Sequence, residues 1–104
     1  MPETDRERRG EVLEKRRPKT EEPQLYHVVL HNDDYTTMDF VIETLESIFN
    51  KSPAEAYRIM MHVHTRGQGL AGTYPYEVAE TKVSLVHDLA REAGHPLRAS
   101  LEKA

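Results

Sequence analysis

Three hydrogen-bond acceptors follow one another at Asn32, Asp33 and Asp34, and no basic side chain stands among them. They separate a β-branched apolar run, residues 25–30, from an amphipathic helical pattern that begins near Met38. We expect a strand-to-helix junction of this kind at a surface edge, where polar side chains remain accessible. Such a cluster of acceptors suits a cation, an ammonium group or hydroxyls.

His64 provides a second polar group that we expect close to the first. It follows Met60 by four residues, so the two side chains share one face of a helix. If that face packs beside the start of the preceding helix, His64 joins Asn32 and Asp34 around one polar spot. The apolar hollow behind this spot would be lined by Met38, Val41, Met60 and Val63. A free protein N-terminus with a bulky first residue carries both an amine and a large side chain, and it suits such a site.

Each of these groups also has a simpler structural interpretation. Asp33 and Asp34 are typical of an Asx turn or a helix cap, and His64 is typical of a helix C-terminus. A metalloenzyme is disfavoured because His62 and His64 are two residues apart on a helix and point away from each other. The chain has no H-E-x-x-H motif and no recognisable serine or threonine nucleophile. We therefore predict a binding protein rather than an enzyme, with no catalytic residue, metal or cofactor.

The elements that would position these residues follow the order β-α-α-β-α-β. The sequence predicts strands at 25–30 and 97–101, and a strand or an extended loop broken by Pro75 at 70–76. Hydrophobic periods predict helices at 38–49, 53–65 and 76–93. This order predicts an α+β two-layer sandwich, in which a small antiparallel sheet packs on three helices.

Local signals refine the ends of these helices. Thr36 is expected to cap the first helix, and Ser52 the second. Gly67 and Gly69 are expected to end the second helix. In the third helix, Val78 belongs to the apolar stripe that we expect to face inward.

Composition divides the chain into a disordered N-terminal extension, residues 1–23, and a folded core domain, residues 24–104. Charges cancel within the extension, so the net charge of -4 lies on the core, and this argues against nucleic acid as a partner. No apolar run approaches the ~18 residues that a membrane span requires. The N-terminus has no apolar signal-peptide core, so we expect a cytoplasmic protein.

Several motifs over residues 26–104 resemble those of the ClpS family, bacterial adaptors that hand N-degron substrates to the ClpA–ClpP protease. The matching motifs are Asn32-Asp33-Asp34-Tyr35-Thr36-x-Met38, Met60-x-x-Val63-His64, Glu77-Val78-Ala79-Glu80-Thr81-Lys82, His95-Pro96-Leu97 and Leu101-Glu102-Lys103. One departure is Thr37, where many relatives carry proline.

The resemblance implies that Asn32, Asp34 and His64 bind the substrate α-amino group and first peptide unit, supported by Asp33. It implies that a first residue of Leu, Phe, Tyr or Trp enters a pocket made by Thr36, Met38, Val41, Met60, Val63 and Leu97. Within that pocket, Met38 would be the gatekeeper that rejects β-branched first residues.

The same resemblance implies that Glu77 and Lys82 face the N-terminal domain of the ClpA unfoldase. The N-terminal extension would serve delivery, and the adaptor would modulate the substrate choice of ClpA. An alternative function is a stand-alone peptide-binding module of another degradation pathway, such as the recognition module of a ubiquitin ligase.

Overall fold

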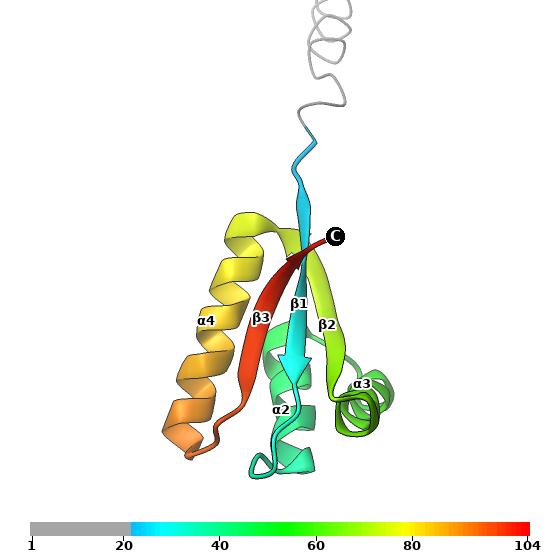
Figure 1. Cartoon of the computed structure of the whole chain (residues 1–104), viewed down its shortest axis with the longest axis vertical. Helices are drawn as coiled ribbons and strands as arrows, with labels where there is room; N and C mark the ends of the chain where they lie inside the picture. Colours follow the sequence, from blue (N-terminus) through cyan, green and yellow to red (C-terminus); the bar gives the residue numbers. More distant parts are fainter. Residues whose placement is uncertain (1–21) are drawn as a thin grey trace, which may run out of the picture.

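A three-stranded antiparallel sheet has β1 (Leu25–His31) at its centre, flanked by β2 (Gln68–Pro75) and β3 (Arg98–Lys103) (Figure 1). The computed structural model describes residues 22–104. The extension predicted to be disordered therefore lies almost entirely outside the described residues. Register places His31 opposite Gln68 on one side and opposite Arg98 on the other.

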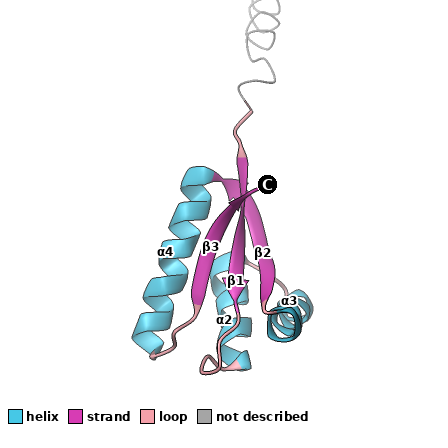
Figure 2. Ribbon diagram, in the orientation of Figure 1, coloured by secondary structure: helices cyan, strands magenta, loops and turns pink. Residues whose placement is uncertain are grey.

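Three helices complete the domain: α2 (Met38–Phe49), α3 (Pro53–Arg66) and α4 (Tyr76–Ala93). α4 packs against all three strands, while α2 packs against both other helices and β2. In Figure 2, α2 lies behind the sheet, α4 runs beside β3 and α3 lies at the lower end of β2. The predicted α+β two-layer sandwich and its element order are confirmed. None of the helices in residues 22–104 is long and apolar enough to cross a membrane.

The helix ends follow the local chemistry with two corrections. The Ser52 hydroxyl accepts the amide of Glu55 at 3.2 Å, as predicted for α3. For α2, however, the cap is Thr37, whose hydroxyl accepts the amide of Phe40 at 3.1 Å. The prediction of Thr36 as the cap was wrong by one residue, because Thr36 is held by a different partner described below.

Only one of the two glycines expected to end α3 does so. Gly67 takes the left-handed conformation, φ 89°, which favours glycine at a helix end. Gly69 lies instead within β2, so its predicted role was wrong. A Cβ at Gly69 would stand 2.7 Å from Cγ2 of Val63, so this glycine allows the strand to run close against α3.

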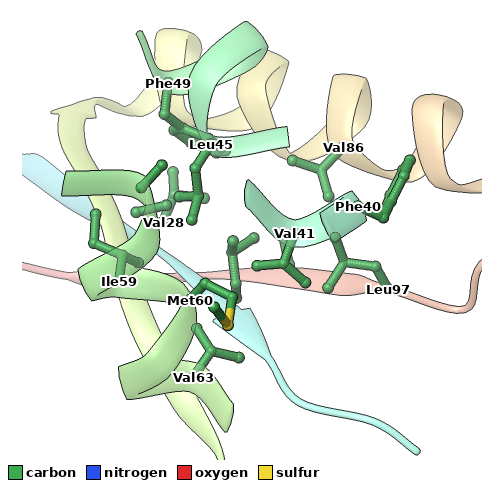
Figure 3. Close-up of a cluster of buried hydrophobic side chains, with 14 of the residues drawn as sticks. Val28, Phe40, Val41, Leu45, Phe49, Ile59, Met60, Val63, Val86 and Leu97 are labelled. Carbon is green, nitrogen blue, oxygen red and sulfur yellow. The ribbon is translucent and has the colours of Figure 1, made fainter. Parts of the chain in front are cut away.

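The core fills the space between the sheet and the helices (Figure 3). Its fully enclosed members include Val28 and Leu30 of β1, Leu45 of α2 and Val86 of α4. Val78 was predicted to point inward, and this was wrong: the side chain is 44% exposed. It stands in the first turns of α4, on the side that forms an outer surface.

Candidate functional site

One backbone hydrogen bond joins the loop after β1 to the end of α3. The amide of Asn32 donates to the carbonyl of Gly67 at 2.9 Å. The bond continues the pairing of His31 with Gln68, so the end of β1 is fixed beside the C-terminal turn of α3. Two segments that are distant in sequence, around Asn32 and around His64, therefore lie at one place in the fold.

Asp33 organises the loop between β1 and α2. Its Oδ1 accepts the amides of Tyr35 and Thr36 at 2.8 and 2.7 Å, and its Oδ2 accepts the Thr36 hydroxyl at 2.7 Å. This is the Asx turn that the sequence offered as the simpler interpretation of the acidic pair. Both carboxylate oxygens of Asp33 therefore accept hydrogen bonds within the loop, whereas the neighbouring Asp34 is exposed.

The electrostatics of the loop favour a charged Asp33. Partial burial opposes the carboxylate, but the hydrogen bonds from Thr36 and Tyr35 outweigh that burial and lower its pKa below the ordinary value. His95 lowers the pKa further by charge. The loop consequently keeps its acceptor bonds, and its negative charge, throughout the neutral range.

A hollow of about 240 Å³ opens beside this loop. Its lining residues are Asn32, Asp33, Asp34, Thr36, Met38, Val41, Met60, Val63 and His64. The floor is apolar and closed, because Val41, Met60 and Val63 are between 2 and 6% exposed. Met38 stands at the rim with 44% exposure. Pockets for drug-sized ligands usually measure roughly 300–1,000 Å³, so this smaller space suits a single large side chain.

The mouth of the hollow carries polar groups with free hydrogen-bonding capacity. Among the hydrogen bonds within residues 22–104, none engages the side chains of Asn32, Asp34 or His64, and all three residues are exposed. No lysine or arginine lines the hollow, while two carboxylates do. The site therefore favours a cationic donor at its mouth and an apolar group at its floor.

The structure brings together all the residues predicted for the amine and pocket sites except Leu97. That residue is 4% exposed and belongs to the buried cluster that includes Val41 and Phe40, as Figure 3 shows. It therefore lies in the core rather than among the residues that line the hollow.

His95 lies near the site, but the sequence pattern did not predict a role for it. The ring of His95 packs against Phe40 in a tilted arrangement, with the ring centroids 4.5 Å apart. His95 is also near enough to Asp33 to lower the pKa of that carboxyl. Only the motif His95-Pro96-Leu97 marked this position in the sequence, and no local periodicity indicates a contact with residue 40.

The two residues expected to face an unfoldase lie elsewhere, on α4. Glu77 and Lys82 line an open hollow of about 300 Å³, completed by Val78, Thr81 and Leu85. Val78 and Leu85 are exposed apolar side chains, 44 and 46% accessible. This hollow shares no lining residue with the first.

Metal ligands do not gather in the part of the chain that the structure describes. Over residues 22–104, no three His, Asp or Glu side chains are arranged to hold a metal ion. His62, the neighbour of His64 in the sequence, lines a different hollow together with His27 and Arg66.

Comparison with protein families gives one match that covers most of the chain. The family model of the ATP-dependent Clp protease adaptor protein ClpS matches residues 21–100. The ATP-dependent Clp protease adapter protein ClpS of Maricaulis maris is 60% identical over 89 residues, which span 86% of this chain and 82% of that protein. Its counterpart from Desulfatibacillum aliphaticivorans is 55% identical over 93 residues, 89% of each chain.

A solved structure has the same fold. Agrobacterium tumefaciens ClpS2, bound to L-phenylalaninamide, superposes with a TM-score of 0.76 and is 39% identical in sequence. The match covers 79% of this chain and 99% of that one.

Proposed function

The chain belongs to the ClpS family of Clp protease adaptors, and from this premise we propose that it binds proteins by a bulky hydrophobic N-terminal residue. The first residues it would accept are Leu, Phe, Tyr and Trp. It would deliver these N-degron substrates to the ClpA–ClpP protease and modulate the substrate choice of ClpA. The protein would act by binding alone, without catalysis of its own.

The observation that carries this proposal is the pairing of free polar groups with a closed apolar floor in one small hollow. A protein N-terminus offers an ammonium group directly beside its first side chain. Those two features match the mouth and the floor of the hollow. The relative from Agrobacterium tumefaciens supports the same chemistry, since L-phenylalaninamide combines a primary amine with an aromatic side chain.

In this proposal Asp34 and His64 accept hydrogen bonds from the substrate ammonium, and Asn32 pairs with the first peptide unit. Asp33 acts indirectly, because its acceptors already hold Tyr35 and Thr36 in place. Each bond to a charged group contributes about 1.5–3 kcal/mol, enough for one lost bond to weaken binding at least tenfold.

The first side chain of the substrate would enter past Met38 and rest on Val41, Met60 and Val63. Thr36 would form part of the wall. Leu97 would support the floor from the core, because it is buried and lies outside the lining. Met38 is exposed at the rim, which suits a gatekeeper that contacts the Cβ of the incoming residue.

The partner surface would be the α4 hollow around Glu77 and Lys82, and the partner the N-terminal domain of ClpA. The exposed Val78 and Leu85 beside a carboxylate support this assignment, because an apolar patch with a polar rim is typical of a protein interface. Since the two hollows share no residue, one molecule would hold substrate and unfoldase simultaneously.

The N-terminal extension keeps the role expected from its composition, as a proposal. Deletion of residues 1–18 should leave peptide affinity unchanged but abolish degradation of an N-degron reporter by ClpA–ClpP. A scrambled extension of equal length should largely restore degradation. Full degradation with the truncated protein would show that the extension has no role in delivery.

His64→Ala, with His62→Ala as a matched control, tests the amine site. Both side chains are exposed on α3, but only His64 lines the hollow beside Asp34. Fluorescence anisotropy with a Phe-initiated peptide should show at least tenfold weaker binding for His64→Ala and an unchanged affinity for His62→Ala. Equal affinities for the two variants would contradict the proposed site.

Delivery is tested by adding the protein to ClpA, ClpP and a Phe-initiated reporter. We expect faster degradation than without the adaptor, and no acceleration with Glu77→Lys. Peptide binding without any effect on degradation would favour the alternative, a peptide-binding module of another degradation pathway.

A further inference from the structure

His95 lies between the end of α4 and the start of β3, where a tight turn fixes its backbone. Gly94 takes the left-handed conformation, φ 78°, and the amide of His95 donates to the carbonyl of Ala90 at 2.8 Å. On the other side Pro96 restricts the chain, and Leu97 is buried in the core. The backbone that carries the half-buried His95 side chain is therefore fixed from both directions.

The ring of His95 packs against the first turn of α2. Its contact there is Phe40, with the ring centroids 4.5 Å apart and an angle of 38° between the ring planes. Phe40 is buried, and its amide donates to the cap residue Thr37. In the sequence Phe40 stands between Met38, at the rim of the hollow beside the Asp33 loop, and Val41, in the floor of that hollow. The contact therefore holds the part of α2 from which the hollow is built.

His95 also acts on the loop before α2, through the charge of Asp33. Partial burial opposes the Asp33 carboxylate, whereas the hydrogen bonds from Thr36 and Tyr35, and then the charge of His95, lower its pKa. The same carboxylate accepts the bonds that shape the loop. Within residues 22–104 no hydrogen bond involves the His95 ring, so the ring acts by packing and charge.

We propose that His95 is a positioning residue for the amine and pocket site, because its ring holds the first turn of α2 and the loop around Asp33 in one arrangement. His95 is not among the residues that line the hollow, so it acts through Phe40 and Asp33 rather than on the ligand. The loop carries the acceptor Asp34, and α2 provides the rim and part of the floor. The effect on substrate binding rests on the proposed function, whereas the hold on the loop does not.

Two substitutions at His95 test this role. His95→Ala removes both contacts, whereas His95→Phe keeps an aromatic ring against Phe40. An aromatic pair contributes enough to change an equilibrium several-fold, so a Phe-initiated peptide should bind His95→Ala at least roughly fivefold more weakly than wild type. His95→Phe should restore the affinity to within about twofold of wild type. Wild-type affinity in His95→Ala would overturn the proposal.

His87→Ala is the matched control for a general loss of stability. The His87 ring is also half-buried beside β3, where its Nε2 accepts the amide of Ala99 at 3.1 Å, but it does not line the hollow. We expect His87→Ala to lower the melting temperature and to keep the peptide affinity within about twofold of wild type. If both alanine variants lost affinity in proportion to their losses of melting temperature, His95 would have only a structural role, and the proposal would be wrong.

NMR spectra without ligand report the loop directly. The amides of Tyr35 and Thr36 donate to Asp33, so their proton shifts should move toward random-coil values in His95→Ala and stay near wild type in His95→Phe. Unchanged shifts in His95→Ala would overturn the inference. The wild-type protein should also show nuclear Overhauser contacts between the rings of His95 and Phe40, and their absence would overturn it even if His95→Ala failed to fold. If wild type binds no Phe-initiated peptide, the proposed function fails, and these spectra still decide whether His95 holds the loop.

Discussion

The carboxylate of Asp33 holds Thr36 twice, through the backbone amide at 2.7 Å and through the side-chain hydroxyl at 2.7 Å. This double contact closes the loop between β1 and α2 and turns Thr36 toward the hollow, leaving Thr37 to cap the helix. The order of the proposed substrate site therefore depends on Asp33, whose own acceptors are already occupied.

Asp33→Ala should weaken binding of a Phe-initiated peptide at least tenfold by loosening this loop. Asp33→Asn should lose much less, because the amide oxygen still accepts the backbone bonds from Tyr35 and Thr36. Calorimetry on both variants provides the measurement, with Asp39→Asn as a control for the loss of a nearby charge. If Asp33→Ala bound the peptide as tightly as wild type, peptide binding would not depend on the Asx turn formed by Asp33.

Selectivity should change with Met38→Ala. A branch at Cβ widens the first residue next to its backbone, where the side chain of Met38 would collide with it. The variant should admit Ile- and Val-initiated peptides while it retains Leu and Phe. Affinities for these four peptides provide the measurement, and unchanged discrimination between Ile and Leu would identify another residue as the gatekeeper.

The stability of the domain should depend on pH through His31. Burial and then the charge of Arg98 lower the pKa of His31 below its ordinary 6.5, against a smaller opposing effect of Glu102. In mildly acidic solution the unfolded chain therefore binds more protons at this position than the native one. The stabilisation is fully present above pH ~6.5 and is lost as the pH falls through the lower folded pKa.

Urea unfolding of wild type and His31→Asn from pH 7.5 to 5 checks this. The wild type should lose more stability on acidification than His31→Asn, in which the contact of His31 with Ser100 is also altered. His62→Asn, an exposed control, should follow the wild-type curve. Parallel curves for wild type and His31→Asn would contradict the prediction.

Thr44→Val should stabilise the domain. The Thr44 side chain is fully enclosed in α2, and its hydroxyl has no hydrogen-bond partner within residues 22–104. Burial of an unpaired hydroxyl costs about 1–3 kcal/mol by mutational measurements, and valine fills nearly the same volume without it. Thermal unfolding should show a higher melting temperature than wild type.

Thr81→Val is the matched control, because the Thr81 hydroxyl is exposed and donates to the carbonyl of Glu77 at 3.0 Å. It should bring no such gain. A lower melting temperature for Thr44→Val than for wild type would mean that the hydroxyl is satisfied after all.

The helices and strands could be predicted from the sequence because each has a clear hydrophobic period and distinct ends. Ser52 with Pro53, and Gly67, define the ends of α3 by chemistry local to a few residues. The association of His64 with Asp34 also followed, since His64 lies in the last turn of α3, Asp34 lies in the loop before α2, and both line the hollow. Periodicity could not show that Val78 lies on the outer side of α4.

Contacts between residues far apart in the sequence could not be predicted from the local hydrophobic pattern. Three contacts each join residues about 30 or more positions apart: the bond from Asn32 to Gly67, the ring contact of His95 with Phe40 and the bond from Lys82 to Ile48. Such contacts depend on how the elements pack, and no short motif encodes them. For the same reason the sequence did not indicate the contact of Lys82 with α2.

N-terminal acetylation of the ligand tests whether the protein recognises a free N-terminal amine. Acetylation removes the ammonium and leaves the side chain and the remaining peptide intact. Calorimetry with the wild-type protein should give clear binding of a Phe-initiated peptide and at least tenfold weaker binding of its acetylated form. Equal affinity for the two peptides would contradict recognition of the amine, because the free acceptors of Asp34 and His64 would then have no part in binding.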